Sequence, residues 1–373
     1  MLLMQDCEKN TYIKILYTMD IIIVAPSLDS SQNVSGVSAV TTFIINNNKL
    51  QQYIHFQQGR QDSEGKGFSR YLRVLKNYRE WKKVLNKYPE ALIHYNYPLD
   101  TPSIVRDFFF IRYAYRHKRE MVIHLHGGLY LFKEDKPWII DEILKTVFNY
   151  DVPLIVLSDK EMNHISKIYH RAHVFSLPNC IDTSMAVAFQ REENNDKLRL
   201  LYLGRIEKNK GIDYILDALK VLDNQGIDFI FRMAGKENVE GDYIGRFKEA
   251  LKDKFEYRGV VSGKCKDDLL KDSDVFVMPS FYEGLPMALL ECMSFGVVPV
   301  VTDVGSIGEY VKDGENGKIV MIKDTETIVN AISSIDEDRK LLAKLSGNAR
   351  NTIFTRLDPK EYVKSLNMIY QNV

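Results

Sequence analysis

The sequence predicts an α/β protein of two doubly wound, Rossmann-like domains, and three observations lead to this fold class. Two series of short runs rich in Val, Ile and Leu alternate with segments of helical length, a pattern typical of parallel sheets covered on both faces. The polar stretch QREENNDK, 190–197, separates the two series. At 373 residues, the chain also exceeds the size of one ordinary core. We expect the two domains to face a central cleft.

The first series predicts a domain over 19–189. Its opening strand lies within 20–36, and the strand ends in a loop of small residues before a helical segment. Further strands are expected at 91–97, 121–128, 153–158 and 172–179. Residues 1–18 are interpreted as an extension in front of this domain.

The second series predicts a domain over 198–356. Strands are expected at 198–204, 229–235, 255–259, 274–280 and 297–301, each followed by a helical segment. The last segment, 357–373, has the pattern of an amphipathic helix with Tyr362, Leu366, Ile369 and Tyr370 on one side. We expect this helix to pack back toward the first domain.

Composition excludes several classes of protein. Fifty basic residues balance fifty acidic ones, so no overall field favours nucleic acid. The cysteines Cys7, Cys180, Cys265 and Cys292 are scattered, which predicts neither a disulfide framework nor a zinc site. No apolar run approaches the roughly 18–20 residues that span a bilayer, and the start of the chain lacks a secretory pattern. We expect a cytoplasmic protein.

The stretch FYEGLPMALLE, 281–291, places Glu283 before a Gly-Leu-Pro turn and Glu291 eight residues later, on the predicted next helix. In doubly wound sheets ligands bind at the carboxyl ends of the strands. The amides around 285–288 at a helix N-terminus would form an anion site, and the two carboxylates would accept from hydroxyls on either side. The segment alone equally fits a capping acid and a surface glutamate.

A second turn, LGRIEKNKG at 203–211, supplies Arg205 and Lys210 after another predicted strand. Two cations at such a turn suit a diphosphate, because arginine binds it bidentately and lysine acts as a point charge. The alternative is a solvated loop. Two such turns in one domain favour a shared anion.

Together these motifs closely resemble the GT4 family of retaining glycosyltransferases, which have the GT-B fold. The resemblance covers nearly all of 19–370 and is most specific in 200–311. It implies that Glu291 binds the nucleotide ribose and Glu283 the donor sugar, with Arg205 and Lys210 on the diphosphate. The turn residues Gly284, Leu285, Pro286 and Met287 would complete the donor site.

The first domain resembles the family more loosely. SGVSAV, 35–40, is similar to the glycine-rich loop beside the donor phosphates; Gly36 would bind the donor, but Ser35 stands where a second glycine is common. HLHGG resembles the strand that ends in the active-site histidine, placed at His126, while His124 is interpreted as a core histidine. LPNCID, 177–182, resembles a hinge segment in which Cys180 replaces the usual glycine.

No metal and no cofactor are expected. The sequence Asp272-Ser273-Asp274 matches a D-x-D pattern, but it precedes its predicted strand and would lie on the order of 13 Å from the site. We interpret it as a solvated strand entry. Arg205, Lys210 and the helix amides would take the place of a metal ion at the diphosphate.

The resemblance implies a metal-independent, retaining glycosyltransferase with His126 orienting the donor sugar. The acceptor would be a glycan or a polyprenyl-diphosphate-linked sugar, and the pathway bacterial capsule, O-antigen or exopolysaccharide assembly. Two alternatives stay open: a nucleotide-sugar epimerase on the same fold, and a non-catalytic subunit that binds a nucleotide sugar. Donor base, donor sugar and acceptor are not determined by the sequence.

A basic segment, 66–119, raises the question of a membrane. Between positions 66 and 87 one acid, Glu80, accompanies the bases Lys66, Arg70, Arg73, Lys76, Arg79, Lys82, Lys83 and Lys87. Apolar residues recur at helical spacing at Val74, Tyr78, Trp81, Leu85 and Tyr88. The face is either core with solvated charges, or a surface that docks peripherally on anionic lipid of the inner plasma-membrane face.

Overall fold

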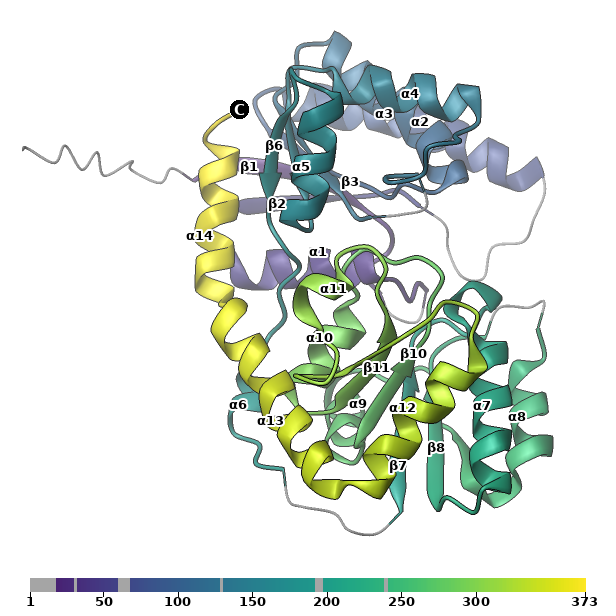
Figure 1. Ribbon diagram of the computed structural model, residues 1–373. Coiled ribbons are helices and arrows are strands. Elements are labelled where there is room, and N and C mark those ends of the chain that lie inside the picture. Colours follow the sequence, from purple (N-terminus) through teal and green to yellow (C-terminus); the bar gives the residue numbers. More distant parts are fainter. Residues whose placement is uncertain (1–17, 30–31, 60–67, 128–129, 192–196, 238–240) are drawn as a thin grey trace, which may run out of the picture.

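The computed structural model describes residues 18–29, 32–59, 68–127, 130–191, 197–237 and 241–373. Residues 1–17 of the predicted extension 1–18 and most of the predicted linker 190–197 lie outside these residues. Figure 1 shows two α/β domains, with helix α1 of the first facing α10 and α11 of the second. Apolar runs form the buried strands and amphipathic segments form the covering helices.

The first domain is built on a parallel sheet with the order β2-β1-β3-β4-β5-β6. Its strands are β1 (Asp20–Ala25), β2 (Gln52–Gln57), β3 (Leu92–Tyr97), β4 (Met121–Leu125), β5 (Pro153–Val156) and β6 (His173–Ser176). Its helices are α1 (Gly36–Asn47), α2 (Phe68–Lys87), α3 (Thr101–Arg116), α4 (Trp138–Phe148) and α5 (Asp159–Ile168), with the short α6 (Ser184–Val187) leading out of the domain.

The second domain is also built on a parallel sheet, but with the order β12-β11-β10-β7-β8-β9. Its strands are β7 (Leu198–Leu203), β8 (Phe229–Ala234), β9 (Phe255–Tyr257), β10 (Val275–Met278), β11 (Val298–Thr302) and β12 (Lys318–Val320). The other elements are η1 (Lys208–Lys210), α7 (Ile212–Asn224), α8 (Tyr243–Leu251), η2 (Lys252–Lys254), α9 (Gly263–Lys271), α10 (Met287–Ser294), α11 (Ile307–Tyr310), α12 (Thr325–Glu337), α13 (Arg339–Arg356) and α14 (Pro359–Tyr370).

Strand order places the two predicted donor turns side by side. In the second sheet β7 pairs with β8 on one side and with β10 on the other, so the direction of winding reverses between β7 and β10. Crevices at such reversals are where doubly wound sheets bind ligands. The turn with Arg205 follows β7, and the turn with Glu283 follows β10. Their adjacency is therefore a property of the topology.

The sequence did not predict two of the described strands, β2 and β12. β2 lies at the edge of its sheet, and only Phe56 of its six residues is buried. Its polar composition therefore lacks the apolar run that marks the central strands. β12, also an edge strand, has three residues and one buried side chain. Edge strands need fewer apolar residues because one flank meets solvent or loop.

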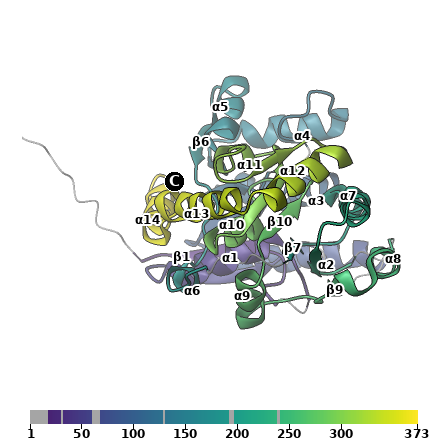
Figure 2. The same ribbon diagram turned by 60° about the horizontal axis from the view of Figure 1, so that its bottom comes forward.

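Helix α14 crosses from the second domain to the first (Figures 1 and 2). The ring of Tyr362 packs edge-on against Phe43 of α1, with 5.3 Å between ring centroids. The Asn367 side chain exchanges hydrogen bonds with Asn48 and accepts another from Gln51. Tyr370 reaches β3, where its hydroxyl lies 2.6 Å from Nδ1 of His94. The end of the chain thus contributes to the first domain's core.

The interpretation of 272–274 as a solvated strand entry is wrong for two of its three residues. Ser273 is fully buried, and Asp274 is only 4% exposed. The Asp274 carboxylate accepts hydrogen bonds from the guanidinium and backbone N–H of Arg199 and from Arg191. Asp272 is exposed and pairs with Arg199 and Arg232. The arginines explain the burial, because a desolvated carboxylate needs a compensating cation.

Candidate donor-binding site

The turn before α10 brings the first predicted carboxylate to a cation. Pro286 is the N-cap of α10 in extended conformation, so the helix itself begins at Met287. Glu283 accepts a hydrogen bond from Nζ of Lys210, at 2.7 Å. Their side chains are 12% and 19% exposed. The pair joins the two turns that follow β10 and β7.

Both domains hold this turn in place. Gly127 at φ +65° packs so closely that an added Cβ would lie 2.4 Å from Cα of Gly284. The amide of Asn179 donates to the Leu285 carbonyl at 2.7 Å, and Ser306 N–H donates to the Gly284 carbonyl at 3.0 Å. Ser306 also donates to Glu161, a buried first-domain carboxyl whose pKa is raised to about 7 by burial. The turn is therefore fixed before any ligand binds.

Arg205 contacts the first domain. Its Nε donates to the Val34 carbonyl at 2.6 Å, and one terminal nitrogen donates to Oδ1 of Asn33 at 3.2 Å. The Arg205 carbonyl accepts from the buried Tyr202 hydroxyl, which fixes the turn after β7. Besides these contacts, Arg205 lines a cavity together with Lys210 and Glu283.

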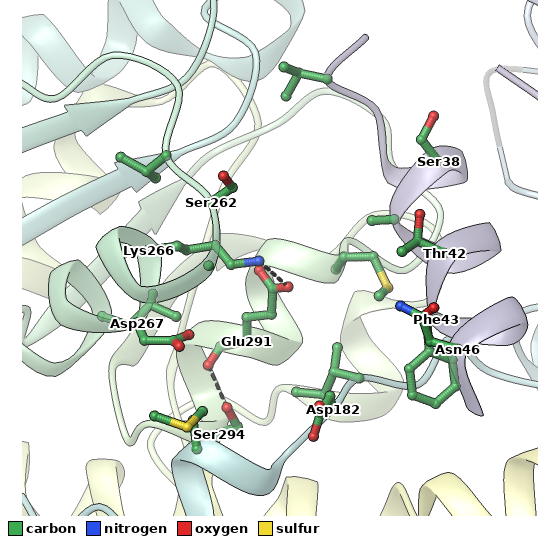
Figure 3. Close-up of a pocket in the computed structure, with 18 of the residues that line it drawn as sticks. Ser38, Thr42, Phe43, Asn46, Asp182, Ser262, Lys266, Asp267, Glu291 and Ser294 are labelled. Carbon is green, nitrogen blue, oxygen red and sulfur yellow. Dashed lines mark hydrogen bonds and ion pairs between the residues drawn. The ribbon is translucent and has the colours of Figure 1, made fainter. Parts of the chain in front are cut away.

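Two cavities meet at Glu291. A cavity of about 380 Å³ is lined by Gly36, Arg205, Lys210, Glu283, Pro286, Met287 and Glu291, among others. A larger one of about 590 Å³ continues between α1, α9 and α10. Glu291 and Lys266 line both, and Figure 3 shows their side chains pointing toward one another, with Nζ and Oε1 2.6 Å apart. A ligand lying along both cavities would pass this pair.

The first domain places neutral imidazoles behind the turn before α10, where the His126 carbonyl lies close to Gly284. Nε2 of His126 lies 2.6 Å from Oδ1 of Asn96, whose amide nitrogen donates to the Val24 carbonyl. Since this fixes the amide oxygen as the group facing the ring, Nε2 of His126 carries the proton. Burial, and then the nearby His94, lower the pKa of His126 to about 3. The ring is uncharged at neutral pH.

His124 is a core residue, as interpreted, but only one of its two ring nitrogens has a hydrogen-bond partner in the described structure. It is completely buried, its Nδ1 lies 3.2 Å from Nε2 of His94, and its Nε2 is without a hydrogen-bond partner in the described structure. Burial lowers the pKa values of both rings, that of His94 to about 3. The histidine cluster His94, His124 and His126 therefore stays neutral.

The two departures from the family pattern have local explanations. The Ser35 hydroxyl caps α1 by accepting from Ser38 N–H at 3.2 Å, a role that glycine could not fill. Gly36 keeps the open space at the cavity, because an added Cβ would meet no atom within 4 Å. Cys180 is buried, and burial raises the pKa of its thiol to about 12, so it is an apolar filler of the hinge segment.

The structure brings most, but not all, predicted donor residues to one cavity. Gly284, Leu285 and His126 do not line the 380 Å³ cavity, and Leu285 is buried beneath the turn. His126 touches the turn through its backbone, since its carbonyl lies 2.8 Å from a Cβ built on Gly284. Lys266, Asn96 and Asn33 were missed; each is an ordinary polar residue whose partner lies on another element. Among the described residues, no group of three or more metal-ligand side chains converges.

Residues 186–352 match the protein family described as glycosyl transferases group 1. The match covers less than half of the chain. The chain is 29% identical over 172 residues to the UDP-Gal:alpha-D-GlcNAc-diphosphoundecaprenol alpha-1,3-galactosyltransferase of Escherichia coli, covering 45% of this chain and 44% of that one. It is 29% identical over 158 residues to the alpha-D-kanosaminyltransferase of Streptomyces kanamyceticus, covering 42% and 40%. The chain thus matches less than half the length of these relatives.

Solved structures extend the likeness to both domains. Sucrose-phosphate synthase from Thermosynechococcus elongatus superposes with a TM-score of 0.77 at 16% identity, over 95% of this chain and 98% of that one. HepE from Anabaena in complex with UDP-glucose gives 0.72 at 15%, over 95% and 100%. The predicted GT-B fold, with two doubly wound domains, is confirmed. The residues that match the family, 186–352, lie mainly in the second of the two domains.

Proposed function

We propose that the protein transfers a sugar from a nucleotide-sugar donor to a glycan or lipid-linked acceptor, with retention at the anomeric carbon and without a metal ion. The observation that carries this proposal is the convergence of Arg205, Lys210, Glu283 and Glu291 on one cavity at the N-terminus of α10. The two cations and the helix amides match the diphosphate of a nucleotide sugar. The two carboxylates match its ribose and sugar hydroxyls.

The diphosphate would lie between Arg205, Lys210 and the first amides of α10. When the bond from the anomeric carbon to the phosphate oxygen breaks, its electron pair stays on the diphosphate. Positive groups and helix amides stabilise that charge where it develops. No metal ion is then needed to hold the leaving group.

The orientation of the donor follows from the two cavities. Glu291 stands at their meeting point, so the nucleoside would extend into the 590 Å³ cavity and the ribose would pass Glu291. The sugar would lie at Glu283, against the turn that His126 and Gly127 contact. A neutral His126 can position a sugar hydroxyl but cannot serve as an acid at pH 7. Resemblance to the family implies that the acceptor attacks the anomeric carbon from the same face from which the diphosphate leaves.

The acceptor would enter over the first domain. One relative acts, by its name, on a sugar linked to diphosphoundecaprenol, and others carry names from lipopolysaccharide core and colanic acid biosynthesis. We therefore propose a glycan or polyprenyl-diphosphate-linked acceptor in bacterial surface polysaccharide assembly. Within the described residues no helix has the length and apolarity to cross a membrane. We propose that a lipid-linked acceptor is reached by peripheral docking.

Helix α2 offers a surface for this docking. Trp81 and Leu85 of its predicted apolar face are buried, so that face is core. Its opposite face carries Leu72 and Leu75, 52% and 59% exposed, followed by the exposed bases Lys76, Arg79, Lys83 and Lys87. Apolar residues beside basic ones suit an anionic lipid surface, where each cation contributes roughly 1 kcal/mol.

Vesicle sedimentation tests the docking. Wild type should pellet with anionic vesicles and less so as salt rises, because screening weakens each attraction. A variant carrying Lys76→Glu, Arg79→Glu and Lys83→Glu should stay in the supernatant. The second-domain variant Lys220→Glu/Lys248→Glu/Lys344→Glu is the matched control, since all three lysines are exposed, on α7, α8 and α13. Equal pelleting with neutral vesicles, or no response to the α2 charges, contradicts the membrane part of the proposal.

The transferase proposal is tested by screening nucleotide sugars. A true donor should raise the melting temperature of the full chain by mass action, and it should yield labelled product with a lipid-linked acceptor. Anomeric configuration of the product, read by NMR, tests retention. Tight donor binding without product across a panel of acceptors would favour the non-catalytic subunit, and conversion of the sugar without transfer would favour the epimerase.

A further inference from the structure

Lys266 is a cation on the nucleoside side of the proposed donor site, and the sequence motifs that resemble the family did not include it. Lys266 lies on α9, and its Nζ is 2.6 Å from Oε1 of Glu291 on α10. The two side chains are 27% and 20% exposed. They stand where the two cavities join and point toward one another in Figure 3.

A similar pair lies on the sugar side. There Lys210 holds Glu283 at 2.7 Å, with a lysine and a glutamate again contributed by different elements. Each carboxylate that would accept from donor hydroxyls is thus in contact with an ammonium group. Partly exposed ion pairs contribute only about 0–1 kcal/mol to folding, so fold stability alone is a weak reason for two such pairs inside one binding cavity.

A carboxylate and an ammonium together satisfy a vicinal diol more fully than a carboxylate can. Each hydroxyl has a proton to donate and lone pairs that accept. The Glu291 carboxylate can only accept hydrogen bonds from the hydroxyls, whereas an ammonium group has three N–H donors for their oxygens. Within the described residues the Lys266 ammonium group has one hydrogen-bond partner, the Glu291 carboxylate. Donors of Lys266 are therefore left for oxygens of a ligand.

We propose that Lys266 and Glu291 bind the ribose 2′- and 3′-hydroxyls as a unit, so that the site selects ribonucleoside over deoxyribonucleoside diphosphates. Glu291 accepts from the hydroxyls, and Lys266 donates to one of their oxygens while it holds the carboxylate in place. The inference rests on the proposed function, because it takes the ligand to be a nucleotide sugar. A site built around a hydroxyl discriminates strongly against its absence, since the partner groups are then left unpaired.

Calorimetric titration of the full chain provides the test. UDP, CDP, ADP and GDP are each compared with their 2′-deoxy and 3′-deoxy forms, and the tightest-binding base is carried forward. Wild type should bind the ribonucleotide about 10–100-fold more tightly than at least one deoxy form, the loss expected for a hydrogen bond to a charged group. In Lys266→Met that ratio should fall by about tenfold. The losses of affinity caused by the deoxy ligand and by Lys266→Met should not add, because both remove the same contact.

Lys264→Met is the matched control, since Lys264 is an exposed lysine on the same helix that lines neither cavity. Melting temperatures establish that each variant folds, and Lys266→Gln repeats the test should the methionine variant fail to fold. An unchanged ratio in the Lys266 variants, or equal wild-type affinity for ribo and both deoxy forms, overturns the inference alone. Failure of all ribonucleoside diphosphates to bind contradicts the proposed function and the inference with it.

Discussion

The two domains contribute opposite kinds of chemical group to the site. The second domain supplies charges: Arg205, Lys210, Lys266, Glu283 and Glu291 all lie on its loops and helices and line the cavities. At the 380 Å³ cavity the first domain supplies uncharged groups, among them Ser35 and Gly36, while its acid Asp182 lines the 590 Å³ cavity. Such a division suits a reaction in which charge moves onto a diphosphate held by one domain while the sugar meets uncharged groups of the other.

The largest expected effect comes from removing a second-domain cation. Lys210→Ala and Arg205→Ala should each lower kcat by about 10²–10³, the loss typical of one group that stabilises developing charge. Lys208→Ala changes an exposed lysine in the same turn and should stay near wild type. Initial rates at saturating donor measure the effect. Equal, small losses in all three variants would mean that the cations do not act on the diphosphate.

The two carboxylates should separate kinetically. Glu291→Ala should mainly raise KM for the donor, because ribose contacts are alike in the ground and transition states. Glu283→Ala should mainly lower kcat, because the reacting sugar changes shape and charge during transfer. Steady-state kinetics for both variants check this. Wild-type parameters in both would remove Glu283 and Glu291 from the site.

The neutral histidines of the first domain should appear in the pH dependence of stability. The pKa of His94 is about 3 when folded and about 6.5 when unfolded. Between these values the unfolded chain binds the extra proton, so stability falls as pH falls below about 6.5, by about 1.4 kcal/mol per pH unit. Glu161, with its raised pKa, acts in the opposite sense and is common to all variants compared.

Urea unfolding between pH 7.5 and 5 checks this dependence. On acidification, His94→Gln should lose less stability than wild type, with a difference of about 1.4 kcal/mol per pH unit. His173→Gln removes an exposed histidine and should follow the wild-type curve. Parallel curves for wild type and His94→Gln would show that the buried ring is already protonated, or accessible to protons, in the folded state.

The smallest expected effect is that of chelation. If Arg205, Lys210 and the α10 amides hold the diphosphate as proposed, transfer should continue in excess EDTA. Asp272 and Asp274, the one D-x-D pattern considered, are already bound by arginines. Activity lost on chelation and restored by Mg²⁺ or Mn²⁺ would contradict metal independence.

What could be predicted from the sequence depended on whether the signal lies in one contiguous segment. Central strands and the two charged turns were predictable, because apolar runs and contiguous motifs carry their own signal. β2 was not, because an edge strand shows no apolar run. Nor were Lys266 and Asn96, whose roles arise from partners 25 and 30 residues away on other elements. Asp274 was misread because the arginines that permit its burial lie on a different strand and loop.

The most direct test of the central claim is a crystal structure with the tightest-binding nucleoside diphosphate. The account predicts the diphosphate between Arg205, Lys210 and the first amides of α10, with the ribose hydroxyls on Glu291. A diphosphate bound away from both cations, or a ribose turned away from Glu291, would contradict it.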